Sequence, residues 1–245
     1  MANLSIRLLT MRSFLRLGYP WHLESDTESI CKGYGLSGNI DECRPLRGAG
    51  RSRPTRAQSQ ARTRNELMAT AKRLFLRDGY QATTLDKVAK AAGFTKGAVY
   101  SNFRTKDDLC LAVLDEIHAE RAAEVAEIIA APTATDRLKR MTEWAERVVG
   151  DPNWTQLELE FSVHARRDDH LRDELATRLD NIVGMVGAAL GTPDDLEIQR
   201  SRAEAAVAVL ALGVGLGLFR SIDPGIPVTG MISALRAIAG LTRNG

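Results

Sequence analysis

TTLDKVAKAAGFTKGAVYSNFRTKDDL, residues 83–109, is the stretch that indicates the fold. Its first half has apolar side chains at helical spacing, and Thr83 and Asp86 have the spacing of a capping box. Gly93 interrupts this pattern, and Thr95 is suited to cap a second helix. The apolar positions of the two helices are Leu85, Val88, Ala89, Ala92, Val99 and Phe103. Two helices joined by a short turn containing glycine predict a helix-turn-helix, whose second helix enters the DNA major groove.

A third helix is expected to precede this pair. It has an apolar stripe and ends at Gly79, the kind of residue that favours a helix C-terminus. Phe94, in the turn, is expected to pack against the same apolar side chains. The stripe consists of Leu67, Ala71, Leu74 and Phe75. The sequence therefore predicts a small three-helix core.

The segment resembles the recognition segment of TetR-type bacterial transcriptional regulators over residues 58–108. The family has His just before the Phe of its motif, whereas this chain has Asn102. The matching positions are Gly93, Phe94, Thr95, Lys96, Gly97, Ala98, Val99, Tyr100, Phe103, Arg104 and Lys106. The resemblance implies a DNA-binding domain followed by helices that bind an effector and form a dimer.

Several of these residue types suit contact with DNA. A glycine lets the backbone approach a base or phosphate closely, and a helix N-terminus attracts anions. We expect Lys96, Gly97 and Ser101 to lie nearest the bases. The residues expected mainly on phosphates are Thr84, Thr95, Tyr100, Asn102 and Lys106, with Arg62 from the first helix. The alternative is that the lysines and the tyrosine are solvated surface residues.

The positive charge of the chain is concentrated near this unit. The net charge is only +2, yet residues 44–64 contain seven arginines and no acidic residue. Such a segment suits an arm that contacts the DNA backbone or minor groove, although a solubilising tail has the same composition. Residues 1–55 as a whole are rich in Gly, Ser and Arg and predict a disordered basic extension.

The domain organisation follows from the helical patterns. We predict an extension at 1–55, a helix-turn-helix DNA-binding domain at 56–107, and a helical effector-binding and dimerisation domain at 108–245. A capping box at Thr105 and Asp108 starts a long helix that links the last two. Further helices are expected near 138–150, 154–167, 171–190, 192–220 and 228–241. Strand-like alternation is absent from the sequence, so the predicted fold class is all-α.

Residues 205–219 form an unusually apolar stretch of a predicted helix. A helix that is apolar all round is buried on several sides. At 15 residues, the uncharged run is shorter than a membrane span, so no membrane partner is expected. The family resemblance implies a homodimer interface here, and its predicted residues are Leu210, Gly213, Gly217 and Phe219. The alternative is a core helix of a monomer.

The family resemblance also implies a small-molecule pocket in the C-terminal helices. The candidates combine apolar, aromatic and titratable side chains, as such pockets do. They are Met141, Trp144, Leu157, Phe161, His164, Ile182 and Met185. The alternative for each is ordinary core packing.

Catalytic and metal-binding patterns are missing from the sequence. The three cysteines lack metal-ligand spacing, and the sequence contains no nucleophile elbow, phosphate loop or paired carboxylates. We therefore expect no enzyme activity, catalytic residue, metal or cofactor, and a cytoplasmic location. The leading hypothesis is a homodimeric repressor that leaves a palindromic double-stranded DNA operator when a small apolar effector binds. The alternative is a constitutive DNA-binding protein without an effector.

Overall fold

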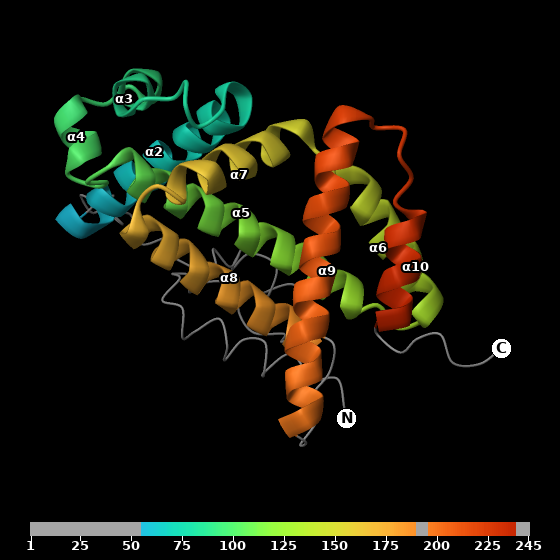
Figure 1. Ribbon diagram of the computed structural model, residues 1–245. Coiled ribbons are helices and arrows are strands. Elements are labelled where there is room, and N and C mark those ends of the chain that lie inside the picture. Colours follow the sequence, from blue (N-terminus) through green and yellow to red (C-terminus); the bar gives the residue numbers. More distant parts are fainter. Residues whose placement is uncertain (1–54, 190–195, 239–245) are drawn as a thin grey trace, which may run out of the picture. The chain divides into compact units, whose positions relative to one another are not determined.

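A computed structural model describes residues 55–189 and 196–238 of the chain. All the regular structure in these two ranges is helical, which confirms the all-α fold class (Figure 1). The extension predicted at 1–55 lies outside the described residues except for Thr55, and so does the helix start predicted at 192–195. The helices are α2 (Arg56–Asp78), α3 (Leu85–Ala92), α4 (Lys96–Tyr100), α5 (Lys106–Ile129), α6 (Ala134–Val148), α7 (Pro152–Ala165), α8 (Asp169–Ala189), α9 (Leu196–Ile222) and α10 (Thr229–Ile238).

Helices α2, α3 and α4 form an N-terminal unit, here called the head. Gly79 ends α2 with φ 80°, and Gly93 ends α3 with φ 73°, conformations that favour glycine. Thr95 caps α4 by accepting a hydrogen bond from the Ala98 N–H at 3.2 Å. The predicted helix-turn-helix is therefore present, with its turn at Gly93.

The start of α3 differs from the prediction by one residue. Thr84, and not Thr83, caps this helix by accepting from the Lys87 N–H at 3.2 Å. Thr83 is fully buried, and its hydroxyl donates to the Gly79 carbonyl at 2.9 Å. Spacing alone does not distinguish the two adjacent threonines. Which of them caps α3 depends on which side chain is buried by the turn between α2 and α3.

The core of the head continues into α5 and α7. Phe75, Val88 and Val99 are fully buried, and Phe94 packs against them from the turn as predicted. Leu157 and Phe161 of α7 belong to the same apolar cluster. The head is thus packed onto α5 and α7 and does not have a separate core.

Helix α5 begins with the predicted capping box, in which Thr105 and Asp108 bond each other's backbone N–H groups. It runs from the head to α6, where a second apolar cluster joins α6, α9 and α10. The buried Arg220 of α9 connects this region, because its guanidinium donates to the carbonyls of Val149 at 2.8 Å and Glu146 at 3.2 Å. Helices α6–α10 are called the body below.

Helix α9 packs on α7 and α8 but leaves much apolar surface exposed. Residues Arg202–Ile222 are long and apolar enough to cross a membrane by length and composition, and only 17% of that stretch is buried. The core helix of a soluble protein meets the same criteria, so the expectation of no membrane partner stays a prediction. Exposed apolar surface on such a helix also suits a protein interface.

Candidate nucleic-acid interface

Helix α4 presents a face that its own chain does not cover. Tyr100 is 54% exposed, and Lys96 and Gly97 are exposed beside it. A Cβ atom at Gly97 would have only the Thr95 hydroxyl nearby, at 3.8 Å. Packing within the chain therefore does not require glycine at this position. Its absent side chain instead leaves room for an external molecule to approach the helix N-terminus.

Lys96 is held at the edge of this face by Asp86 of α3. Its ammonium forms an ion pair with the Asp86 carboxylate, and this hydrogen bond raises the pKa of Lys96. Both side chains are largely exposed. Lys96 remains positioned to contact a phosphate, but the contact would compete with a carboxylate that sequence reasoning missed.

Ser101 and Asn102 follow α4 and lie against its last turn. Ser101 donates to the Ala98 carbonyl at 2.9 Å, and Asn102 donates to the same oxygen at 2.8 Å. Arg64 of α2 donates to the Asn102 carbonyl at 2.8 Å and lies over the Phe103 ring at 4.2 Å. Arg64 therefore fixes the exit of α4 from inside the chain, a role that its place in an arginine-rich run did not indicate.

Unlike the exposed Lys96, Lys106 has its ammonium bound within the chain. Its ammonium donates to the Tyr80 carbonyl at 3.1 Å and lies 3.8 Å from the centre of the Tyr80 ring. Burial lowers the pKa of Lys106. A phosphate contact by Lys106 would have to share the ammonium with this internal partner.

The remaining predicted DNA contacts are at the margins of the head. Arg62 is 82% exposed and pairs with Glu66 one turn along α2, at 2.8 Å. The side chains of Thr84 and Thr95 are both occupied as helix caps. A threonine that caps a helix still lies beside free N–H groups, so both positions remain compatible with a phosphate contact.

The seven residues predicted to line an effector pocket do not form one site. Leu157 and Phe161 are buried in the cluster shared with the head, whereas Met141 and Trp144 pack against the second cluster. His164 forms an ion pair with Asp107 at 3.2 Å, facing the head. Ile182 is partly exposed and Met185 is 37% exposed on α8. These side chains therefore have different neighbours within the chain, and their role in an effector site stays a prediction.

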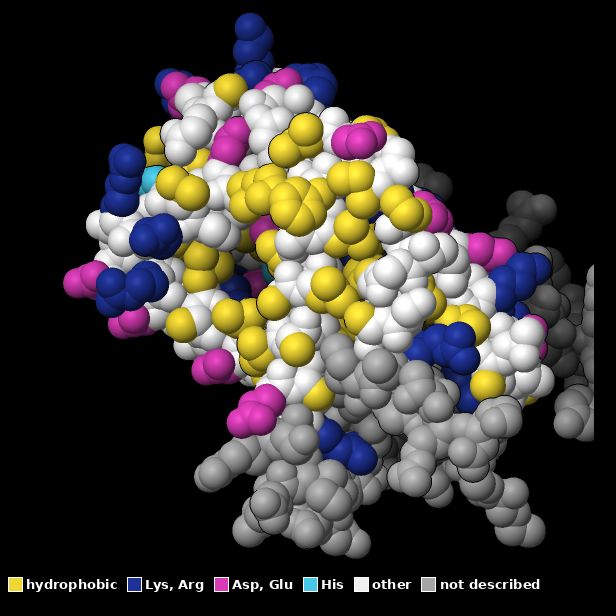
Figure 2. All heavy atoms as spheres, turned by 45° about the vertical axis from the view of Figure 1, so that its right-hand side comes forward, with side chains coloured by type: hydrophobic (Ala, Val, Ile, Leu, Met, Phe, Trp, Pro, Cys, Tyr) yellow, Lys and Arg dark blue, Asp and Glu magenta, His cyan; other side chains and the backbone are white. Residues whose placement is uncertain are grey.

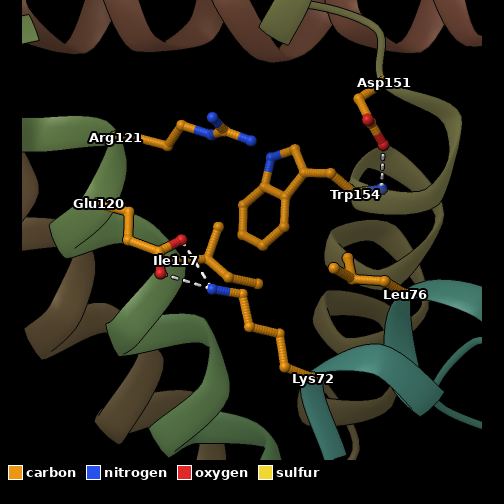
Figure 3. A pocket seen from close by; sticks show the side chains of 7 residues that line it. All are labelled: Lys72, Leu76, Ile117, Glu120, Arg121, Asp151 and Trp154. Atoms are coloured by element: carbon orange, nitrogen blue, oxygen red, sulfur yellow. Dashed lines mark hydrogen bonds and ion pairs between the residues drawn. The ribbon is translucent and has the colours of Figure 1, made fainter. Parts of the chain in front are cut away.

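Two hollows beside α5 are described here, within the part of the chain that the structure describes. One, of about 60 Å³, lies where α2, α5 and α7 meet, and Figure 3 shows the Arg121 guanidinium pointing at the Trp154 indole there, with the Lys72–Glu120 ion pair below. The other, of about 230 Å³, lies between α5 and α6 beside Trp144, whose indole N–H donates to Glu124 at 2.7 Å. Both are smaller than most small-molecule sites, which have about 300–1,000 Å³.

Comparison with known proteins places the head in a family. Residues 67–113 match the model of the bacterial regulatory proteins, tetR family. The chain is 30% identical over 110 residues to the transcriptional repressor AcnR of Corynebacterium glutamicum, covering 45% of this chain and 54% of that protein. It is 28% identical over 161 residues to the transcriptional repressor Rv1474c of Mycobacterium tuberculosis, covering 55% of this chain and 86% of that protein. The chain thus spans about half the length of AcnR, but most of Rv1474c.

Solved structures agree with this assignment at the level of the fold. A TetR-family regulator from Rhodococcus sp. superposes with a TM-score of 0.58 at 20% identity, over 75% of this chain and all of that one. The similarity therefore extends beyond the head to the helices of the body. The match over residues 67–113 and the related repressors support a TetR-type transcriptional regulator, and the solved structures share its fold.

Proposed function

We propose that the chain is a sequence-specific transcriptional repressor that binds a palindromic double-stranded DNA operator as a homodimer. The observation that carries this proposal is the uncovered face of α4, where only the Thr95 hydroxyl lies near Gly97 and where Lys96 and Tyr100 are exposed. Lys96 and Gly97 are the first two residues of α4, where backbone N–H groups favour phosphate, and Tyr100 is its last. The proposed site of action is the bacterial cytoplasm, where chromosomal DNA lies.

The proposed dimer contact is the exposed apolar face of α8 and α9. Val207, Val214, Leu218 and Ile222 recur along one side of α9 and are 37–77% exposed. Figure 2 shows hydrophobic side chains gathered on the side of the molecule that turns forward with α9. A second copy of the chain is the proposed occupant, because a two-fold protein reads two half-sites about 34–36 Å apart.

The predicted interface residues contribute unequally to this face. Phe219 is 60% exposed and is available to a partner. Gly217 is buried, with the Gly150 N–H and the Thr155 hydroxyl 3.7 and 3.9 Å from the site of a Cβ. Gly217 thus faces its own chain at ordinary van der Waals distance, and its role in a dimer stays a prediction. Gly213 and Leu210 are partly covered.

A small apolar effector is proposed to weaken operator binding by acting on the body. The family assignment supports an effector, but the two hollows described above are small. The alternative is constitutive DNA binding without an effector. A compound that raises the melting temperature and also weakens operator binding would support the effector. If no compound in a broad apolar library does both, the constitutive reading is preferred.

The test of DNA binding is selection from a random double-stranded pool with the full chain. Enrichment of a palindrome is the expected result, with loss of enrichment in a Gly97→Leu variant whose side chain fills the open approach. Sedimentation without detergent should give a dimer. Failure to enrich any sequence with folded, dimeric protein would contradict the proposed function. Sedimentation as a monomer that partitions into lipid vesicles would instead assign the α9 face to a membrane.

A further inference from the structure

The chain enters and leaves the helix-turn-helix at the same place. The corner segment, residues 79–81, leads into α3, and Lys106 and Asp107 begin α5 directly after the loop that follows α4. The Tyr80 hydroxyl donates to the Asp107 carboxylate, and Lys106 donates to the Tyr80 carbonyl. The two ends of the DNA-binding segment are therefore bonded to each other.

Helix α7 holds this junction with three side chains on adjacent turns, here called the α7 clasp: Glu160, Phe161 and His164. The Gln81 N–H donates to Glu160 at 3.1 Å. The Phe161 ring lies edge-on to the Tyr80 ring with centroids 5.1 Å apart. The His164 imidazole is 3.2 Å from the Asp107 carboxylate that also accepts the Tyr80 hydroxyl.

The corner itself fits the clasp closely. A Cβ at Gly79 would lie 2.8 Å from both carboxylate oxygens of Glu160, and the φ of 80° already disfavours any other residue. Thr83 is buried behind the corner and bonds its backbone. Displacement of α7 would therefore move or release the corner, because both partners are tightly placed.

We propose that α7 sets the position of the recognition helix through this clasp, so that Glu160 and His164 are positioning residues for DNA binding. The inference rests on the proposed function but concerns residues distant from the DNA-facing side of α4. A head that is held in one orientation loses less conformational freedom when it binds DNA. Any event in the body that shifts α7 would then change operator affinity without altering a DNA contact.

The test compares a Glu160→Ala/His164→Ala variant with a His170→Ala/Glu174→Ala control. The control removes the same residue types from a pair on α8, 3.5 Å apart, in which His170 is exposed and Glu174 also bonds Arg178 of the same helix. The probe is the palindromic duplex recovered by selection, with affinity measured over a salt series. The clasp variant should bind about fivefold more weakly or worse, with an unchanged salt slope, because no phosphate contact is lost. The control should bind the duplex with the affinity and salt slope of the wild type.

Two further measurements separate positioning from folding. Hydrogen exchange of the Gln81 amide should accelerate in the clasp variant, while the melting transition stays cooperative. A Glu160→Gln variant keeps an acceptor oxygen for this amide and should retain most of the affinity if the alanine variant fails to fold. Faster exchange at Gln81 with operator affinity equal to the control would overturn the inference. Failure of the wild type to bind any duplex would instead remove the proposed function, and the inference with it.

Discussion

The head and the α8–α9 pair differ in where they place their apolar side chains. In the head, Phe75, Val88 and Val99 are fully buried by neighbours from the same chain. On α9, Val207, Val214 and Ile222 are 52%, 50% and 77% exposed. The stability of the head should therefore not depend on protein concentration, whereas α8–α9 should gain stability from a partner.

The same substitution in both regions gives the largest expected contrast. Phe75→Ala should lower the free energy of unfolding by about 3–5 kcal/mol, because it leaves a cavity in a closed core. Phe219→Ala, at a residue that is 60% exposed, should leave the unfolding of dilute monomer nearly unchanged. Urea titrations at several protein concentrations provide the measurement. Equal losses for the two variants would show that Phe219 is buried against its own chain.

A charge placed in the exposed stripe should weaken the dimer. Val214→Glu would bury an unpaired carboxylate between two copies, which should raise the dimer dissociation constant about 100-fold or more. Val163→Glu is the control, because Val163 on α7 is 57% exposed and lies outside α8–α9. Analytical ultracentrifugation would measure the dimer dissociation constants of both variants. If Val214→Glu sediments as a dimer of wild-type affinity, a different surface forms the interface.

Glu158 of α7 should make the stability of the body depend on pH. Burial raises the pKa of Glu158 from 4.5 to about 7. The folded chain then keeps a proton that the unfolded chain loses, so this contribution to stability is full below pH 4.5 and is lost as the pH rises to about 7. The expected loss is about 1–3 kcal/mol, since one pKa unit corresponds to about 1.4 kcal/mol.

A Glu158→Gln variant isolates this effect. Burial lowers the pKa of His118, so the contribution of His118 to stability falls as the pH drops. In the wild type this change partly masks the opposite change due to Glu158. The difference in unfolding free energy between wild type and variant removes the His118 contribution. A difference that stays constant from pH 4.5 to 7 would show that the Glu158 carboxyl is solvated.

The adjacent threonines at the start of α3 test a smaller difference within the head. Thr84→Ala should cost about 1 kcal/mol, because it removes the cap on the Lys87 N–H. Thr83→Ala should lower the free energy of unfolding by more, since it leaves a small cavity and removes the hydrogen bond to the Gly79 carbonyl. Thermal unfolding would rank them. A smaller loss for Thr83→Ala than for Thr84→Ala would show that the buried Thr83 hydroxyl contributes little to stability.

The head was predictable because its signals are local. A capping threonine, a glycine with positive φ and a periodic stripe each act within a few residues, so the turn at Gly93 and the start of α5 could be located. The position of the cap at Thr84 was missed by one residue, since it depends on burial of Thr83 beneath the corner.

The internal partners of the site residues could not be predicted in the same way. Lys106 and Tyr80 are far apart in the sequence, as are Arg64 and Asn102, and their contacts follow from packing of α2 against α5 and α4. The neighbours of the predicted effector residues could not be predicted for a similar reason. His164 has the spacing of a pocket residue, but its neighbour is Asp107 at the start of α5.

Lys96 in the head and Lys106 at the start of α5 provide the finest test of the comparison between exposed and internally occupied side chains. Lys96→Ala should reduce the magnitude of the salt slope of operator binding by about 0.9, the value expected for one lost phosphate contact. Lys106 already donates to the Tyr80 carbonyl and lies on its ring, so Lys106→Ala should change the slope less and the melting temperature more. Titrations of both variants between low and high salt, with melting curves, measure the two effects. If Lys106→Ala reduces the slope as much as Lys96→Ala, its ammonium leaves Tyr80 for a phosphate in the complex, and the junction beneath α7 rearranges when DNA binds.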